Sequence, residues 1–199
     1  HGFGTLGATG AGAGEEQGVQ DDIDVYFATF AKSMASTGAF IAGDKQIIDF
    51  MKYNMRSQMF AKSLQSVLVE GALKRLNMLR LRPELKAKLW ENVNALQSGL
   101  KERGFDIGTT QSCVTPVYLK GSSPEAMVLV KDLRENHNIF CSIVVYPVIP
   151  KGIIILRLIP TSTHTQEDIK LTLDAFSTIR DRLEGNVYKR MSYGIEAAS

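Results

Sequence analysis

The residue with the clearest chemical potential is Lys32, a lysine in a small-residue setting between two short apolar runs. Hydroxyl groups flank it at Thr29 and Ser33, and the runs 23–28 and 39–42 are typical of buried strands joined by a turn. Apolar surroundings disfavour the ammonium form of a lysine, and a neutral amine can attack a carbonyl carbon. Spacing alone favours the alternative, an inert surface lysine on a hairpin loop, so the rest of the chain must decide.

A second candidate is Arg157, which interrupts the apolar run 153–159. A guanidinium inside such a run needs a partner, because burying an unpaired charge is costly. One partner is a ligand carboxylate, which arginine binds bidentately and orients strongly. The other is a protein carboxylate, in a salt bridge at the edge of a sheet.

Composition places the chain among ordinary globular proteins and excludes several classes. Of its 199 residues 44% are hydrophobic and 22% charged, and the net charge of +2 is too small and too scattered to indicate a nucleic-acid partner. No signal peptide and no run long enough to span a membrane is evident. Cys113 and Cys141 lie in apolar runs and are expected to be buried free thiols of a cytoplasmic protein, and no Cys/His spacing indicates a metal site.

Glycine is concentrated in residues 1–18. Such a loop lets the backbone approach another group closely, so it is either a phosphate cradle or a flexible connector. After the two expected strands, residues 54–62 are expected to be irregular. Helical spacing and capping residues predict helices over 45–53, 63–80 and 83–103.

The pattern changes after Gly104. Strands are predicted over 114–119, 139–145 and 153–158, and helices over 123–136 and 165–183, the last capped by Thr165. This order predicts a small α+β domain, an open sheet covered by helices on one face. The polar residues 186–199 are expected to form a mobile tail.

Several motifs occur in an order that resembles one enzyme family. They are His1-Gly2, Thr29-Phe30-Ala31-Lys32-Ser33, the segment 56–63, and Arg157 followed by Thr163-His164-Thr165. Together they are similar to the α-oxoamine synthases, fold-type I enzymes that use pyridoxal 5'-phosphate, over residues 1–183. The resemblance implies an α/β fold and the C-terminal half of such an enzyme. It assigns 1–62 to the end of the large cofactor-binding domain, 63–104 to connecting helices and 105–185 to the small α+β domain.

The resemblance also implies a role for each motif residue. Lys32 is the lysine that links covalently to the cofactor and later acts as general base. Thr29 binds the cofactor phosphate, His1 hydrogen-bonds the phenolic oxygen, and Ser63 reaches the phosphate of the neighbouring subunit in a homodimer. Arg157 receives the α-carboxylate of the amino acid. His164 is assigned either to helix capping or to packing, and Lys62 to solvent.

Three positions depart from the family pattern. Ala28 and Ala39 stand where glycine is usual, and each adds one methyl group without removing any chemistry. Ala61 stands where serine or threonine is common, which weakens the expected contact across the dimer.

The implied reaction is a condensation of an amino acid with an acyl-CoA, with loss of carbon dioxide, giving an α-aminoketone and CoA. Similarity to the serine palmitoyltransferase and 2-amino-3-ketobutyrate CoA ligase branches favours serine or glycine. An aminotransferase on the same fold, or a non-catalytic partner subunit, are the alternatives. The residues that stack on the cofactor ring and pair with its nitrogen are expected outside these 199 residues, so this chain alone is expected to be inactive.

Overall fold

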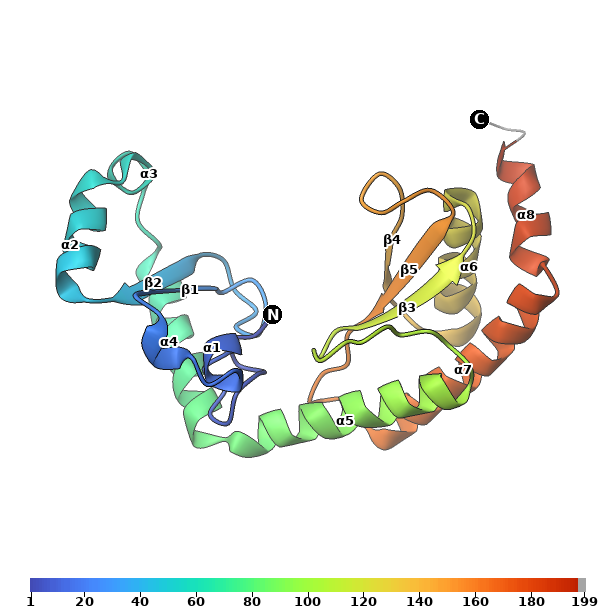
Figure 1. Ribbon diagram of the computed structural model, residues 1–199, viewed down its shortest axis with the longest axis horizontal. Coiled ribbons are helices and arrows are strands. Elements are labelled where there is room, and N and C mark those ends of the chain that lie inside the picture. The colour runs from blue at the N-terminus through green and yellow to red at the C-terminus, as the bar shows by residue number, and fades with distance from the viewer. Residues whose placement is uncertain (197–199) are drawn as a thin grey trace. The chain divides into compact units, whose positions relative to one another are not determined.

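The computed structural model describes residues 1–196, with side chains up to residue 193, and forms two compact units. The first comprises residues 1–87 and the second begins at Lys88 (Figure 1). The two meet in sequence within one helix, α5 (Pro83–Glu102). The assignment of 63–104 to connecting helices therefore stays a prediction, and each unit is described by itself.

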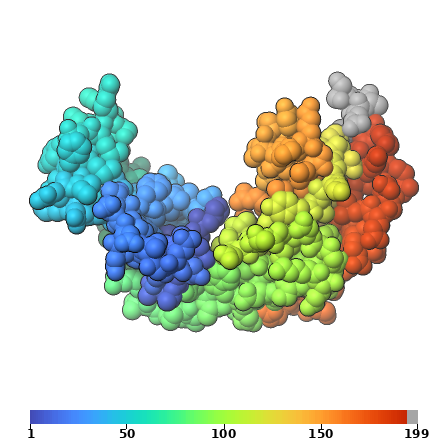
Figure 2. All heavy atoms as spheres, in the orientation of Figure 1, coloured from blue at the N-terminus to red at the C-terminus, as the bar shows by residue number. Residues whose placement is uncertain are grey.

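The first unit consists of one hairpin and several helices, blue to green in Figure 2. Its elements are α1 (Ala13–Glu16), the 3₁₀ turn η1 (Gln20–Asp22), β1 (Val25–Thr29), β2 (Ala39–Gly43), α2 (Lys45–Asn54), α3 (Arg56–Met59), α4 (Ser66–Leu81) and the first turn of α5. The single turn of α3 lies in a segment that was expected to be irregular.

The two strands of the first unit form an antiparallel hairpin, with Val25 opposite Gly43 and Thr29 opposite Ala39. The expectation that both are buried is wrong for the chain described here, since β2 is largely exposed and Phe27 on β1 is 66% exposed. Strand side chains alternate between faces, and one face of this hairpin is packed. On that face Phe40 stacks against Phe30 with ring centroids 5.7 Å apart.

A small hydrophobic core supports this hairpin. Phe30 and Met34, which lie on either side of Lys32, are buried against Ala72 of α4. Burial of these two neighbours fixes the backbone of the turn while leaving the lysine between them exposed. The turn that carries Lys32 is thus anchored by packing on both sides.

The second unit is the α+β arrangement that the sequence predicts. Beyond α5 it contains β3 (Thr115–Lys120), α6 (Ser123–His137), β4 (Ser142–Val144), β5 (Ile153–Leu158), α7 (Gln166–Glu184) and α8 (Val187–Glu196). The sheet is antiparallel in the order β3-β5-β4, so β5 is its central strand.

Helices cover one face of this sheet, as expected. Ile154, Leu156 and Leu158 of β5 are almost completely buried, whereas the alternate residues Ile155 and Arg157 point to the other face and are half-buried. The buried side chains form one core with residues of α5, α6 and α7. Arg157 therefore lies on the face opposite the core.

Capping boxes begin two of the helices. In α7 the Thr165 side chain accepts a hydrogen bond from the Asp168 N–H, as predicted, and Asp168 reaches back to Thr165. In α6 the cap is Ser122, paired with Glu125, one residue before the Ser123-Pro124 start predicted from sequence. A reciprocal pair of this kind satisfies two free N–H groups at a helix start.

The prediction of a mobile polar tail over 186–199 is wrong for residues 187–196, which form α8, and its last three residues, 197–199, lie outside the described residues. Tyr188 is 2% exposed, and its hydroxyl donates a hydrogen bond of 2.6 Å to Asp132 of α6. Asp132 also accepts hydrogen bonds from Arg182 and Asn136. Helix α8 is held against the second unit because the ring of Tyr188 enters the core and its hydroxyl donates to a carboxylate.

Within residues 1–196 no helix is both long and apolar enough to cross a membrane. The side chains of residues 1–193 include no group of three or more His, Cys, Asp or Glu residues placed to hold a metal ion. Cys113 and Cys141 are buried and free, as predicted.

Candidate active site around Lys32

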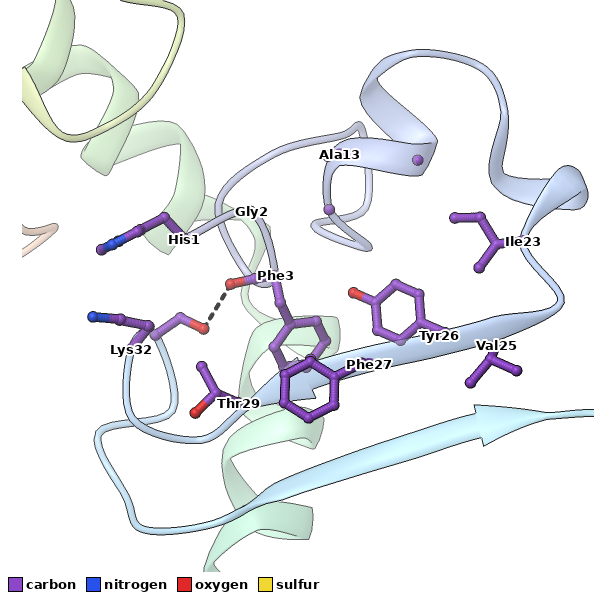
Figure 3. Close-up of a pocket in the computed structure, with 14 residues that line it drawn as sticks. His1, Gly2, Phe3, Ala13, Ile23, Val25, Tyr26, Phe27, Thr29 and Lys32 are labelled. Carbon is purple, nitrogen blue, oxygen red and sulfur yellow. Dashed lines mark hydrogen bonds between the residues drawn. The ribbon is translucent and has the colours of Figure 1, made fainter. Parts of the chain in front are cut away.

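His1, Thr29 and Lys32, which lie up to 31 positions apart in the chain, line one cleft of about 360 Å³ in the first unit. Figure 3 shows the nitrogen-bearing ends of His1 and Lys32 pointing in the same direction. Aromatic side chains, among them Phe3 and Tyr26, form another part of the lining. The cleft therefore combines two nitrogen groups and a hydroxyl with apolar surface.

Backbone hydrogen bonds hold the turn that presents Lys32. The N–H of Phe30 donates to Gly38 (2.8 Å), and the N–H of Ala35 donates to the carbonyl of Lys32 (3.0 Å). Gly38 has φ of +106°, a backbone conformation in which any residue with a side chain is strained. Its neighbour Ala39 lies in strand β2, where a side chain is accommodated. The glycine that this turn requires is thus present, and the alanine beside it is tolerated.

The hydroxyl groups on either side of Lys32 are engaged differently. Ser33 donates a hydrogen bond of 2.6 Å to the carbonyl of Phe3, which ties the lysine turn to the segment that carries His1 (Figure 3). Thr29 accepts from the N–H of Ala31 at 3.1 Å and lies 3.3 Å from the carbonyl of Gly38. The second contact is long, so the proton of the Thr29 hydroxyl is only weakly held within the chain.

The glycine-rich segment is neither a free phosphate cradle nor a connector. The N–H groups of Thr9 and Ala11 donate to the Glu15 carboxylate, and Gly7 donates to Glu16. The hydrogen bond from Thr9 is the main cause that holds the pKa of Glu15 below its ordinary value. Protein carboxylates thus occupy these donors, and other residues of the segment, among them Gly2 and Gly12, line the cleft.

Arg157 lies in the second unit, on the central strand, so the alternative of an arginine at a sheet edge is wrong. Among the side chains that the structure describes, those of residues 1–193, none makes a hydrogen bond or ion pair with its guanidinium. Ser142 on β4 and Pro116 on β3 are its register partners. A half-buried guanidinium without an internal partner is suited to an external carboxylate.

His164 has a local role. It is exposed in the turn between β5 and α7, where its Nδ1 accepts a hydrogen bond of 3.0 Å from the Thr161 N–H. This contact requires an unprotonated Nδ1, so a neutral ring carries its proton on Nε2. The residue thus braces the turn before α7, whereas the N-cap of that helix is Thr165, so the capping alternative for His164 is wrong.

Ser63 is not brought to the cleft. It lies exposed in the segment between α3 and α4, as does Lys62, which faces solvent as expected. The role of Ser63 in a second subunit is left as a prediction. Three of the five predicted site residues thus line one cleft of the first unit. The five are His1, Thr29, Lys32, Ser63 and Arg157.

Comparisons with known proteins agree with these motifs. The family model described as aminotransferase class I and II matches residues 2–176. A cysteate-C-fatty acyltransferase of Capnocytophaga ochracea is 65% identical over 96% of this chain and 46% of its own length. The serine palmitoyltransferase of Sphingobacterium spiritivorum is 36% identical over 85% of this chain and 42% of its own length.

Solved structures agree in fold. Sphingomonas wittichii serine palmitoyltransferase superimposes with a TM-score of 0.83 at 29% identity, over 89% of this chain and 45% of that one. A serine palmitoyltransferase with pyridoxal phosphate as internal aldimine matches equally well. The chain thus spans about half the length of these relatives. These matches confirm the resemblance to α-oxoamine synthases and the fold class, a C-terminal part of a fold-type I transferase. The chain belongs to the aminotransferase class I and II family.

Proposed function

We propose that this chain is part of a pyridoxal phosphate enzyme that condenses an amino acid with an acyl-CoA. Carbon dioxide and CoA would leave, and an α-aminoketone would form. The observation that carries the proposal is the cleft in which Lys32, His1 and Thr29 meet. The proposal is also supported by three relatives that match 85–96% of this chain. All three are named as acyltransferases or synthases.

The residues present fit the cofactor. The exposed amine of Lys32 has no hydrogen-bond or ion-pair partner among the side chains described, those of residues 1–193, so it is available to bond to an aldehyde carbon. Thr29 offers a hydroxyl for the phosphate and His1 an imidazole for the ring oxygen. When bound, pyridoxal phosphate supplies an electron sink for carbanion chemistry at Cα.

The residues of this chain would bind, orient and move protons. Lys32, once its amine is free, takes the proton from Cα of the amino acid. Arg157 would bind the α-carboxylate through two parallel hydrogen bonds and so fix which Cα bond is aligned for cleavage.

The amino acid is proposed to be cysteate. The relative named for cysteate is 65% identical, against 36% for a relative named for serine. Serine or glycine, which the sequence motifs favour, stays a prediction, and an assay that compares all three amino acids tests it. Cysteate carries the same α-amino and α-carboxylate groups, so Lys32 and Arg157 would serve it unchanged.

The assembly is proposed to be a cytoplasmic homodimer in which Ser63 contacts the phosphate held by the other subunit. The large exposed side chains of Phe27, Phe50 and Phe60 in the first unit support burial in a larger assembly. The domain assignment 1–62, 63–104 and 105–185 belongs to the same proposal.

The full-length protein tests the proposed function directly. It is incubated with an acyl-CoA and with cysteate, serine or glycine in turn, and free CoA thiol and product mass are measured. Thiol release that depends on the amino acid, with a product that has lost carbon dioxide, is expected. Conversion of the amino acid to its keto acid without thiol release would instead support an aminotransferase. Absence of both reactions would support a non-catalytic subunit.

A further inference from the structure

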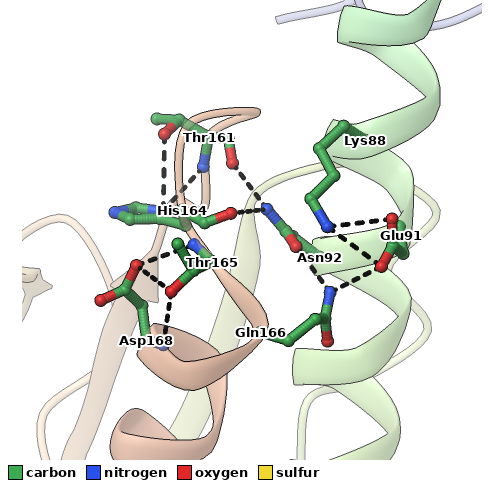
Figure 4. A network of polar contacts seen from close by, with 8 residues as sticks. All are labelled: Lys88, Glu91, Asn92, Thr161, His164, Thr165, Gln166 and Asp168. Atoms are coloured by element: carbon green, nitrogen blue, oxygen red, sulfur yellow. Dashed lines mark hydrogen bonds and ion pairs between the residues drawn. The ribbon is translucent and has the colours of Figure 1, made fainter.

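Asn92 of α5 is a completely buried polar side chain in the second unit. Its amide nitrogen donates to the carbonyl of Thr161 at 2.9 Å and to that of His164 at 2.8 Å. Its amide oxygen accepts from Gln166 at 2.9 Å (Figure 4). Both donors and one acceptor position are therefore used, and the orientation of the amide is fixed.

The segment that Asn92 holds is the turn directly after β5. The turn is closed by the His164 N–H, which donates to the carbonyl of Thr161 at 3.3 Å, and by the contact from the Thr161 N–H to the His164 ring. Asn92 brackets the same two residues from the helix (Figure 4). Asn92 thus links α5 to both ends of the turn through which the chain leaves β5 and enters α7.

Arg157 lies at the end of the stretch of β5 that pairs with both neighbouring strands. Pairing with β4 ends at Arg157 itself, opposite Ser142, and pairing with β3 ends one residue later at Leu158. Only Ile159 and the buried Pro160 separate the end of β5 from Thr161, the first residue that Asn92 holds. Since no described side chain, from residue 1 to 193, holds the Arg157 guanidinium, its direction depends on the backbone on both sides.

We propose that Asn92 is a positioning residue for the amino-acid substrate: by bracketing Thr161 and His164 it fixes the end of β5 and aims Arg157. The inference rests on the proposed role of Arg157 as carboxylate ligand. A small misplacement of a group that orients the substrate removes a large part of what that group contributes to binding and rate, because the contribution depends on orientation as well as contact.

Asn92→Asp in the full-length enzyme is the sharpest test, because it keeps the shape and replaces both donors with an acceptor that faces two carbonyls. Gln166→Ala is a milder second variant, in case the first fails to fold. Tyr188→Phe is the control, because it removes one hydrogen bond in the same unit but none from the turn. The measurements are KM for each substrate, cysteate affinity from the change in cofactor absorbance, and hydrogen exchange of residues 161–165.

The amino-acid KM and dissociation constant are expected to rise about tenfold in Asn92→Asp and less in Gln166→Ala. The KM for acyl-CoA and the affinity for pyridoxal phosphate should stay unchanged, and exchange over 161–165 should quicken. Equal changes in both KM values, or a similar change in Tyr188→Phe, would mean a merely structural role and overturn the inference.

Arg157→Lys separates the two proposals. If Arg157→Lys lowers the affinity for the amino acid while Asn92→Asp does not, the positioning role is overturned and the proposed function stands. If Arg157→Lys leaves amino-acid affinity unchanged, the carboxylate role fails, and the positioning role fails with it.

Discussion

The hydrogen bond between Tyr188 and Asp132 is expected to hold α8 against the second unit. Tyr188→Phe removes the bond and keeps the ring, which is 2% exposed. A hydrogen bond to a charged group contributes about 1.5–3 kcal/mol. A ten-residue helix has little stability of its own, so α8 depends on this docking. We therefore expect its amides to exchange roughly 10–100 times faster, since about 1.4 kcal/mol corresponds to tenfold.

Hydrogen exchange of the full-length protein, read on the peptides of α8, measures this change. Tyr193→Phe is the matched control, because Tyr193 lies on the same helix, is 56% exposed and makes no hydrogen bond to the described residues. It should leave exchange unchanged. Equal exchange in wild type and Tyr188→Phe would refute the reasoning, because it would mean that packing alone holds the helix.

The same contact should depend on pH. Burial alone would raise the pKa of Asp132, but hydrogen bonds from Arg182, Tyr188 and Asn136 together lower it below its ordinary value. A carboxylate whose pKa is lower in the folded protein stabilises the fold at pH values above its unfolded pKa, about 3.9. This contribution is lost as the pH falls from there through the folded pKa. Protection of α8 should therefore decline below about pH 4, and Asp132→Asn should remove this decline.

Two further predictions concern single groups. Burial raises the pKa of the Cys141 thiol to about 11, so at pH 8 it should react with a thiol reagent much more slowly than free cysteine until denaturant is added; fast reaction in the native protein would contradict its burial. Ser122→Ala removes the cap of α6 and should lower the free energy of unfolding of the second unit by about 1 kcal/mol, measured by urea unfolding of the full-length protein; an unchanged midpoint would show that the cap contributes nothing.

Much of the secondary structure follows from local pattern. A short apolar run predicts β5, helical spacing predicts α5 and α7, and Thr165 marks a helix start as predicted. The burial of the first hairpin was not predictable, because a run of apolar residues does not say whether both faces are covered.

The order of α8 and the role of Asn92 depend on distant partners. Tyr188 is one aromatic residue in a polar segment, and its partner Asp132 lies 56 positions away. Asn92 did leave a signal, since it stands on the apolar face of α5 between Leu89 and Leu96. A polar residue at such a position must find hydrogen bonds, but the sequence does not reveal that the turn after β5 supplies them.

The site around Lys32 was predictable in part. The motif identified Lys32, Thr29 and His1, and the structure places them at one cleft. The hydrogen bond from Ser33 to Phe3, which joins the two segments, spans 30 positions and has no local signal.

The most direct test of the central claim is to reduce the full-length, cofactor-loaded protein with borohydride and map the modified peptide by mass spectrometry. Reduction converts a carbon–nitrogen double bond between cofactor and lysine into a stable single bond. The pyridoxyl group is expected on Lys32, and Lys32→Ala should carry none and lose the visible absorbance band. A group attached to another lysine, or a visible band that persists in Lys32→Ala, would contradict the assignment.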